Sequence, residues 1–256
     1  RLYRWDRATG AAMELLAGSG DPTDAELAMR ERLRETASGI TTYDVRDDRV
    51  VAGVGGSLLA WDPVGGGRQI VAADGAYDPR LSPDGQWISW VSNGALQVCS
   101  WDGSDHRILV ESEADITWGV CDFIAAEEFN RSRGYWWLPD SSGLVVQRTD
   151  DTPVPIWHRS DPANPQREPA QQRYPHAGAA NALVEVWRFD LDGEGARVPL
   201  PEAESLATVR GGAIGVFDRA QTALTVCDFD GQTIGRVEQQ PWLDLVPGLP
   251  RRSGDV

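Results

Sequence analysis

The sequence contains no lysine, so all 24 of its basic residues are arginines. Its 39 aspartates and glutamates outnumber them and give a formal net charge of −15. A chain this acidic repels the phosphate backbones of DNA and RNA. We therefore expect no nucleic-acid partner.

Cysteines and long apolar runs are also scarce. No stretch of the chain approaches the roughly 20 apolar residues that a membrane-spanning helix needs, so we expect no membrane partner. The three cysteines are Cys99, Cys121 and Cys227. No pair of them has the spacing of a metal or redox motif, and an odd number argues against a disulfide framework. Reduced thiols and the lack of a visible signal peptide favour a cytoplasmic location.

The few histidines do not form a metal motif. His106, His158 and His176 lie far apart in the sequence, and we expect each to be structural or exposed. The sequence therefore predicts no metal and no cofactor. Residues 1–5 begin inside a strand pattern, so we expect the natural protein to start earlier.

A short motif recurs along the chain: a β-rich run, an aromatic–aspartate pair, a turn and a second β-rich run. The pairs are Trp5-Asp6, Trp61-Asp62, Trp101-Asp102, Phe189-Asp190 and Phe229-Asp230. The spacing is 56 residues from the first pair to the second, and 40 both from the second to the third and from the fourth to the fifth. Aspartate caps its own backbone in such turns, and the glycines that follow supply positive φ. A period of about 40–50 residues with four strands per unit is typical of a β-propeller.

A second turn type supports the same fold. Residues 82–85 (SPDG) and 138–143 (LPDSSG) each precede a β-rich run. Proline, aspartate and glycine in this order favour a turn that opens a strand. The unit resembles repeats shared by TolB-type propellers and the prolyl oligopeptidase superfamily, which indicates a fold but not a function.

Two segments interrupt the β pattern. Residues 21–37 are predicted to form a helix that starts with a capping box of Thr23 and Glu26, and residues 124–133 a shorter one. The predicted fold is all-β: a β-propeller of four-stranded blades with short helical insertions. At about 40–45 residues per blade, the chain would form five or six blades.

Residues 115–137, DITWGVCDFIAAEEFNRSRGYWW, closely resemble the dipeptidyl-peptidase IV family, where a double glutamate lies between ITWG and YWWSPDG motifs. Residues 150–157 look like the family's next strand, and residues 173–181, RYPHAGAAN, are similar to its YPxAGxxN segment. The resemblance covers about residues 30–250. Departures from the family pattern are Phe129 for methionine, Leu138 for serine, Ser141 for glycine and Ala182 for proline.

The resemblance implies an eight-bladed propeller, of which residues 1–256 are part, and an α/β-hydrolase domain beyond them. By motif position, Glu127 and Glu128 bind the free α-ammonium of a peptide and so fix cleavage after its second residue, usually proline or alanine. Arg34, with Arg32 close behind, is the candidate for the family's arginine that holds a substrate carbonyl. The implied partners are peptides with a free N-terminus, the hydrolase domain of the same protein and, because the family is often dimeric, a second copy.

The residues themselves allow two readings of the glutamate pair. Two carboxylates can bind one ammonium through charge-assisted hydrogen bonds. Neighbouring helix positions point about 100° apart, so both carboxylates face one ligand only near a helix end or across a cavity. Alternatively the pair is solvated and interacts with Arg131, three and four positions further on. The flanking aromatic motifs favour the ammonium site, although residues 135–137 are themselves expected to pack between blades.

The chain has no Gly-x-Ser-x-Gly nucleophile elbow, so by itself it should not hydrolyse peptides. The first interpretation is the propeller of a bacterial-type serine dipeptidyl peptidase that releases N-terminal Xaa-Pro or Xaa-Ala dipeptides. The alternatives are a noncatalytic TolB- or WD-repeat-like interaction propeller and a pseudo-peptidase.

Overall fold

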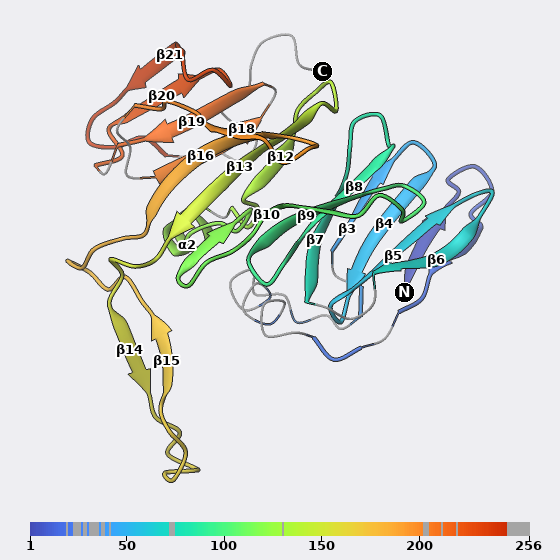
Figure 1. The fold of residues 1–256 in the computed structure, drawn as a ribbon, viewed down its shortest axis with the longest axis horizontal. Coiled ribbons are helices and arrows are strands. Elements are labelled where there is room, and N and C mark those ends of the chain that lie inside the picture. Colours follow the sequence, from blue (N-terminus) through green and yellow to red (C-terminus); the bar gives the residue numbers. More distant parts are fainter. Residues whose placement is uncertain are drawn as a thin grey trace.

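A computed structural model gives the fold and describes residues 1–18, 20–22, 27, 30, 36, 39–40, 42–71, 75–129, 131–201, 205–210, 212–218 and 220–244. Four antiparallel sheets of four or five strands follow one another along this part of the chain and lie side by side (Figure 1). This arrangement confirms the predicted propeller architecture, and we call the sheets the first to fourth blades. No described helix is long and apolar enough to cross a membrane.

The first two blades, like the fourth, each consist of four consecutive strands. The first blade contains β3 (Thr42–Arg46), β4 (Arg49–Val54), β5 (Ser57–Asp62) and β6 (Gly66–Val71). The second contains β7 (Ala76–Leu81), β8 (Trp87–Ser92), β9 (Ala95–Ser100) and β10 (Arg107–Val110). Leu58 of the first blade and Ile88 and Trp90 of the second are fully or almost fully buried in one shared core. The blades are therefore held together by apolar side chains that interdigitate between the sheets.

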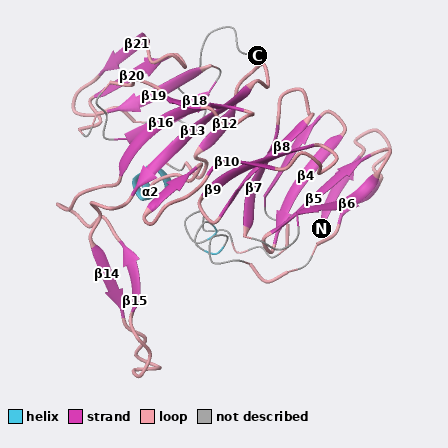
Figure 2. Cartoon of the chain, in the orientation of Figure 1, coloured by secondary structure: helices cyan, strands magenta, loops and turns pink. Residues whose placement is uncertain are grey.

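The third blade departs from this plan at two places. It contains β11 (Ile116–Trp118), β12 (Tyr135–Trp137), β13 (Gly143–Asp150), β16 (Leu183–Asp190) and β17 (Gly195–Arg197). β11 and β12 both pair with β13, at opposite ends of it, so together they form one edge strand that residues 119–134 interrupt. We call these residues the insertion. Between β13 and β16 the chain leaves the blade as a two-stranded hairpin of β14 (Ile156–Arg159) and β15 (Ala170–Arg173), which we call the arm (Figure 2).

The chain ends with one more blade and begins with a hairpin. The fourth blade contains β18 (Ser205–Arg210), β19 (Ala213–Phe217), β20 (Ala223–Cys227) and β21 (Thr233–Glu238). The hairpin of β1 (Leu2–Trp5) and β2 (Ala12–Leu16) lies against β5 and β6. Length alone suggested five or six blades, which is wrong for the described part of the chain. The insertion, the arm and the N-terminal segment use residues that the estimate assigned to blades.

Four of the five predicted turns, at Asp6, Asp62, Asp102 and Asp190, form as the repeat suggested. Asp62 Oδ1 accepts hydrogen bonds from the backbone N–H groups of Val64 and Gly65, at 2.9 and 2.6 Å. In the last repeat Asp228, and not Asp230, caps the turn. Ser141, which replaces the family's glycine, adopts a positive φ of 62°.

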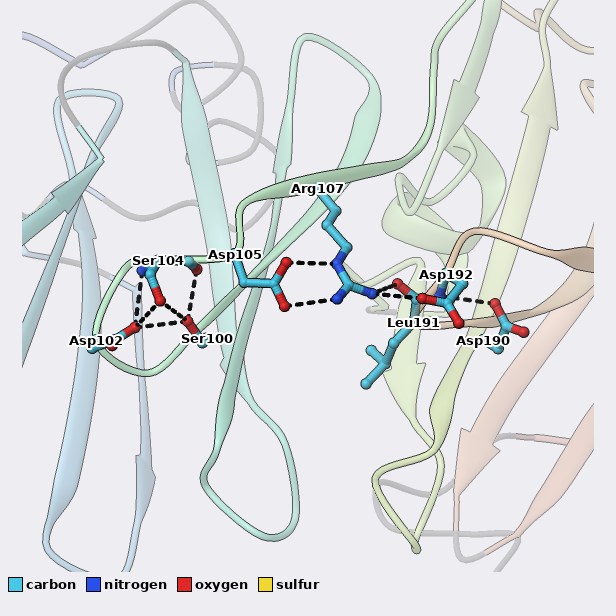
Figure 3. A network of polar contacts seen from close by, with 8 residues as sticks. All are labelled: Ser100, Asp102, Ser104, Asp105, Arg107, Asp190, Leu191 and Asp192. Carbon is cyan, nitrogen blue, oxygen red and sulfur yellow. Dashed lines mark hydrogen bonds and ion pairs between the residues drawn. The ribbon is translucent and has the colours of Figure 1, made fainter.

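An arginine joins the second blade to the third, near the turn that precedes the last strand of each blade (Figure 3). We call these turns the outer turns. Arg107 of β10 binds the carboxylate of Asp105 through two nitrogens, at 2.9 and 2.7 Å. Its Nη1 donates to the carbonyl of Leu191 and to Asp192, both at 2.8 Å, in the turn between β16 and β17. Asp190, the repeated aspartate, holds this turn by accepting from the N–H of Asp192 at 2.9 Å.

The same arrangement recurs at the other two joints. Arg68 of β6 donates to the carbonyl of Trp101 at 2.8 Å in the second blade. Arg188 of β16 lies 3.8 Å from Asp230 in the fourth blade. Each of these arginines contacts an outer turn that carries the aromatic–aspartate motif. The repeat visible in the sequence thus supplies the turns to which the preceding blade is attached, and we call Arg68, Arg107 and Arg188 the joint arginines.

Candidate functional site

The two ends of the insertion are pressed against each other. Gly119 turns the chain out of β11 with a φ of 74°. A Cβ atom on Gly134 would lie only 2.5 Å from the carbonyl carbon of Gly119, so no larger residue fits there without backbone movement. The N–H of Gly119 donates to the carbonyl of Gln147 at 2.9 Å, and the N–H of Gln147 donates to Gly134 at 2.7 Å. β13 therefore bonds to both ends of the insertion and fixes it as a closed loop.

The insertion contains the short helix α2 (Phe123–Glu128), whose start is determined by Asp122. Asp122 has extended backbone angles, and its Oδ2 accepts from the N–H of Ala125 at 3.0 Å, as an N-cap residue does. Ala125 and Ala126 form the buried face of the helix. The predicted helix of residues 124–133 thus starts one residue earlier and ends five residues earlier. It ends because the N–H of Arg131 bonds back to the carbonyl of Ala125, which takes the chain out of the helix.

A buried polar network stabilises the N-terminal end of α2. Asp122 Oδ1 accepts from Gln147 Nε2 at 3.1 Å and from Arg131 Nη2 at 3.4 Å. Arg131 also donates to the carbonyl of Arg133 at 2.6 Å. Burial lowers the pKa of the Arg131 guanidinium, and the Asp122 carboxylate opposes that shift. Arg131 thus bonds to Asp122 and Arg133 within the insertion. The alternative in which it pairs with the two glutamates is wrong.

Glu127 and Glu128 are the last two residues of α2, and both side chains are exposed. Neither has a hydrogen bond or ion pair with another residue in the part of the chain that the structure describes. The last turn also contains no basic residue. Acidic side chains at a helix C-terminus face the negative end of the helix dipole, which is unfavourable by about 0.3–1 kcal/mol each. The pair therefore does not stabilise the helix, and it concentrates negative charge at a point where a cation can approach.

The residue that follows the pair attaches the insertion to the fourth blade. Phe129, the C-cap of α2, stacks on Phe217 of β19, with ring centroids 5.5 Å apart and an angle of 20° between the rings. Phe217 is 1% exposed. The departure from the family's methionine at position 129 thus gives a ring-on-ring contact with the neighbouring blade.

A second contact attaches the insertion to the second blade. Arg133 Nε lies 3.7 Å from Asp78 Oδ2 of β7. Asp78 is buried and has a φ of 48°. Burial raises the pKa of its carboxyl group, while Arg80 and Arg133 act in the opposite direction. The insertion is therefore attached to the blade on each side of it as well as to its own.

The two candidate arginines for the substrate carbonyl, Arg34 and Arg32, lie outside the described residues. Most of the predicted helix of residues 21–37 also lies outside them, although Leu27 and Arg30 are helical. Arg30 Nη2 donates to the carbonyl of Gly39 at 3.2 Å. Arg34 consequently stays a prediction from the resemblance.

The aromatic residues around the site pack as expected. Tyr135 is fully buried, and its hydroxyl donates to the carbonyls of Ser89, at 3.1 Å, and Asp78. Trp136 and Trp137 are partly buried against two different core clusters. These contacts confirm a packing role for residues 135–137.

The histidines are also structural or exposed, as predicted. His106 interacts with Gln97 at 2.7 Å and with the ring of Trp90, and His158 and His176 are exposed. Tyr174, in the segment of residues 173–181, contacts Phe123 of α2. Sequence reasoning missed this contact, since the two residues belong to separate motifs with no shared periodicity.

Comparisons with known proteins show which family model and which proteins this chain resembles. The model of the family described as "Dipeptidyl peptidase IV (DPP IV) N-terminal region" matches residues 37–237. Dipeptidyl peptidase 8 of Homo sapiens is 31% identical over 147 residues, which are 50% of this chain and 16% of that protein. Dipeptidyl peptidase 4 of Bos taurus is 26% identical over 194 residues, which are 69% of this chain and 23% of that protein.

A solved structure has the same fold. The crystal structure of Porphyromonas gingivalis dipeptidyl peptidase 4 superposes with a TM-score of 0.65 at 17% identity, and the match covers 80% of this chain and 31% of that one. The chain thus spans about a sixth to a third of the length of these similar proteins.

Proposed function

Because this chain belongs to the dipeptidyl peptidase IV family and forms part of its N-terminal propeller, we propose that it binds the free N-terminus of peptide substrates for a serine exopeptidase. The propeller admits slender, unfolded peptides and presents their N-terminal end to an α/β-hydrolase domain of the same protein. That domain then releases Xaa-Pro or Xaa-Ala dipeptides. A homodimer and a cytoplasmic location are parts of the same proposal, the latter because the three cysteines are buried and form no disulfide with one another.

The observation that carries the proposal is the placement of Glu127 and Glu128. They lie at the end of a helix that interrupts an edge strand of the third blade, and the loop that holds them is attached to three blades. Both carboxylates are exposed, and helix electrostatics disfavours them where they lie. Such a pair can bind an α-ammonium through charge-assisted hydrogen bonds.

Two carboxylates also explain selectivity for the free amine. An N-acetylated peptide has no positive charge and only one N–H at the same position, so it leaves the carboxylates without a counter-charge. Removal of one partner from a close charge pair costs about 2–5 kcal/mol, which corresponds to a loss of about 30-fold to several thousand-fold in kcat/KM. The family's arginine, for which Arg34 is the candidate here, would hold a substrate carbonyl next to this site.

The experiment uses the intact protein and compares a chromogenic Xaa-Pro substrate with its N-acetylated form. We expect activity on the free amine alone, and a loss of at least 30-fold in kcat/KM in Glu127→Gln and in Glu128→Gln. Glu111→Gln, which removes another exposed glutamate, is the control and should match the wild type. If both substrates are cleaved equally, or if the Gln variants match the control, the proposal is wrong.

An interaction propeller without catalysis is the second candidate. The exposure of both carboxylates favours it, because a purely solvated pair would look the same in this chain. It predicts no hydrolysis of either substrate by the intact protein, as does a pseudo-peptidase. A downstream Gly-x-Ser-x-Gly motif in the gene would separate the peptidase from these alternatives.

A further inference from the structure

The helix that carries the acidic pair is too short to determine its own position. α2 has six residues, whereas isolated helices shorter than about 12–15 residues are marginal in water. Its geometry must therefore come from contacts with the rest of the molecule. The Asp122 network supports its start from below, and the stack of Phe129 on Phe217 attaches its end to the fourth blade.

A third contact attaches the outer face of α2 to the base of the arm. The ring of Phe123, the first residue of the helix, meets Tyr174 edge-on, with centroids 5.3 Å apart and an angle of 82°. Tyr174 in turn packs against Trp157 of β14 at 5.4 Å, and Trp157 lies 5.7 Å from His176. Figure 2 shows α2 beside the place where the arm leaves the third blade.

The base of the arm is itself fixed. Arg173, the neighbour of Tyr174, binds both carboxylate oxygens of Asp115 at 2.7 and 2.6 Å. It also donates to the carbonyl of Val154 at 2.6 Å, across the arm. The N–H of Tyr174 bonds to the carbonyl of Pro155 at 3.0 Å. These bonds therefore fix the position of Tyr174, against which Phe123 packs.

We propose that Tyr174 is a positioning residue: through Phe123 it sets the rotation of α2, and so the place of the Glu127 carboxylate. This inference rests on the proposed function of the acidic pair. Phe123 and Glu127 are four positions apart, so they lie on the same face of the helix. A turn of the helix that moves Phe123 off Tyr174 moves Glu127 in the same direction.

Core packing does not explain the contact. Tyr174 is 38% exposed and Trp157 51% exposed, so their truncation removes little buried apolar area. A Tyr174→Ala variant should therefore fold, which makes the inference testable. Tyr174→Phe keeps the ring and is the rescue variant. Tyr3→Ala removes another exposed tyrosine, 51% exposed on β1, and serves as the control.

The first measurement is hydrogen exchange on the intact protein, which needs no substrate. We expect the amides of α2 to exchange about threefold to tenfold faster in Tyr174→Ala than in the wild type, as the loss of one edge-to-face ring pair implies. Exchange in the blades should not change. Tyr174→Phe and Tyr3→Ala should match the wild type at α2.

The second measurement is the kinetics of the intact protein on a free-amino Xaa-Pro substrate. We expect KM to rise about threefold to tenfold in Tyr174→Ala with kcat within twofold of the wild type, and recovery in Tyr174→Phe. Unchanged exchange at α2 or an unchanged KM overturns the role of Tyr174. If the wild type cleaves the acetylated substrate equally well, the proposed function has failed instead, and the exchange result alone decides whether Tyr174 positions α2.

Discussion

The second and third blades start from the same four-stranded plan, yet the third differs from it in its edge strand and in the connection between β13 and β16. In the second blade β7 is one uninterrupted strand and every connection is short. In the third blade the corresponding strand is split into β11 and β12 around the insertion, and the arm leaves between β13 and β16. The outer turns of both blades are the same kind of aspartate-capped turn. The comparison indicates that the aspartate-capped turns are alike in the two blades, while the edge strand of the third blade is split around the candidate site.

The first prediction tests whether the split strand depends on close contact between the ends of the insertion. Gly134→Ala places a methyl group 2.5 Å from the Gly119 carbonyl carbon. We expect the free energy of unfolding to fall by about 2–3 kcal/mol, because backbone must move to relieve the overlap. Urea denaturation measures the change. Gly235→Ala, whose new methyl meets nothing closer than 3.9 Å, is the control. Equal stability of the two variants would show that the insertion can open without cost.

The next prediction concerns the joint between the second and third blades. Arg107→Ala removes two hydrogen bonds across the joint between the second and third blades. We expect a lower midpoint of urea denaturation than in the wild type because these bonds are lost, and a modest shift because the arginine is partly exposed and Asp192 largely so. Arg236→Ala removes an exposed arginine whose contacts among the described residues lie within its own blade, so it should shift the midpoint less. A smaller effect at Arg107 than at Arg236 would contradict a joining role.

The smallest expected effect is a pH dependence at the joint between the first and second blades. The N–H of Gly65 and the guanidinium of Arg68 lower the pKa of Asp62 from 3.8 to about 2. A carboxylate whose pKa is lower in the folded state stabilises the fold above its unfolded pKa, and this stabilisation is lost as the pH falls through the folded value. We therefore expect the wild type to lose stability between about pH 4 and pH 2 more steeply than Asp62→Asn. Thermal melts across this range give the slopes, and parallel slopes would rule out a role for Asp62.

The sequence predicted the repeated parts of this molecule better than the unique ones. Aspartate-capped turns depend on residues a few positions apart, so their chemistry is readable locally, and Asp62 and Asp190 cap turns as expected. The resemblance located the acidic pair, because Glu127 and Glu128 lie inside a long motif. For the described part of the chain, the number of blades was overestimated because nothing in the composition separates the arm from blade strands.

The contacts that position the candidate site could not be predicted. Asp122, Arg131 and Gln147 meet in a buried network only after the insertion folds onto β13. The contact between Phe123 and Tyr174 joins two motifs separated by the whole arm. Such pairings depend on tertiary geometry, and a single sequence contains no periodicity that reports them.

The joint arginines affect the order in which the blades can be joined while the protein is synthesised. Each of them precedes in the chain the turn that it contacts; Arg107 is 85 residues ahead of Asp192. At about 5–20 residues per second, a ribosome needs about 4–17 s to make the intervening segment. During that time Arg107 has no partner across the joint, and the nascent propeller ends in an unattached blade. During synthesis the joints therefore become able to close one at a time, in order from the N-terminus, and a pause in translation before Asp192 would lengthen the time in which Arg107 lacks its partner.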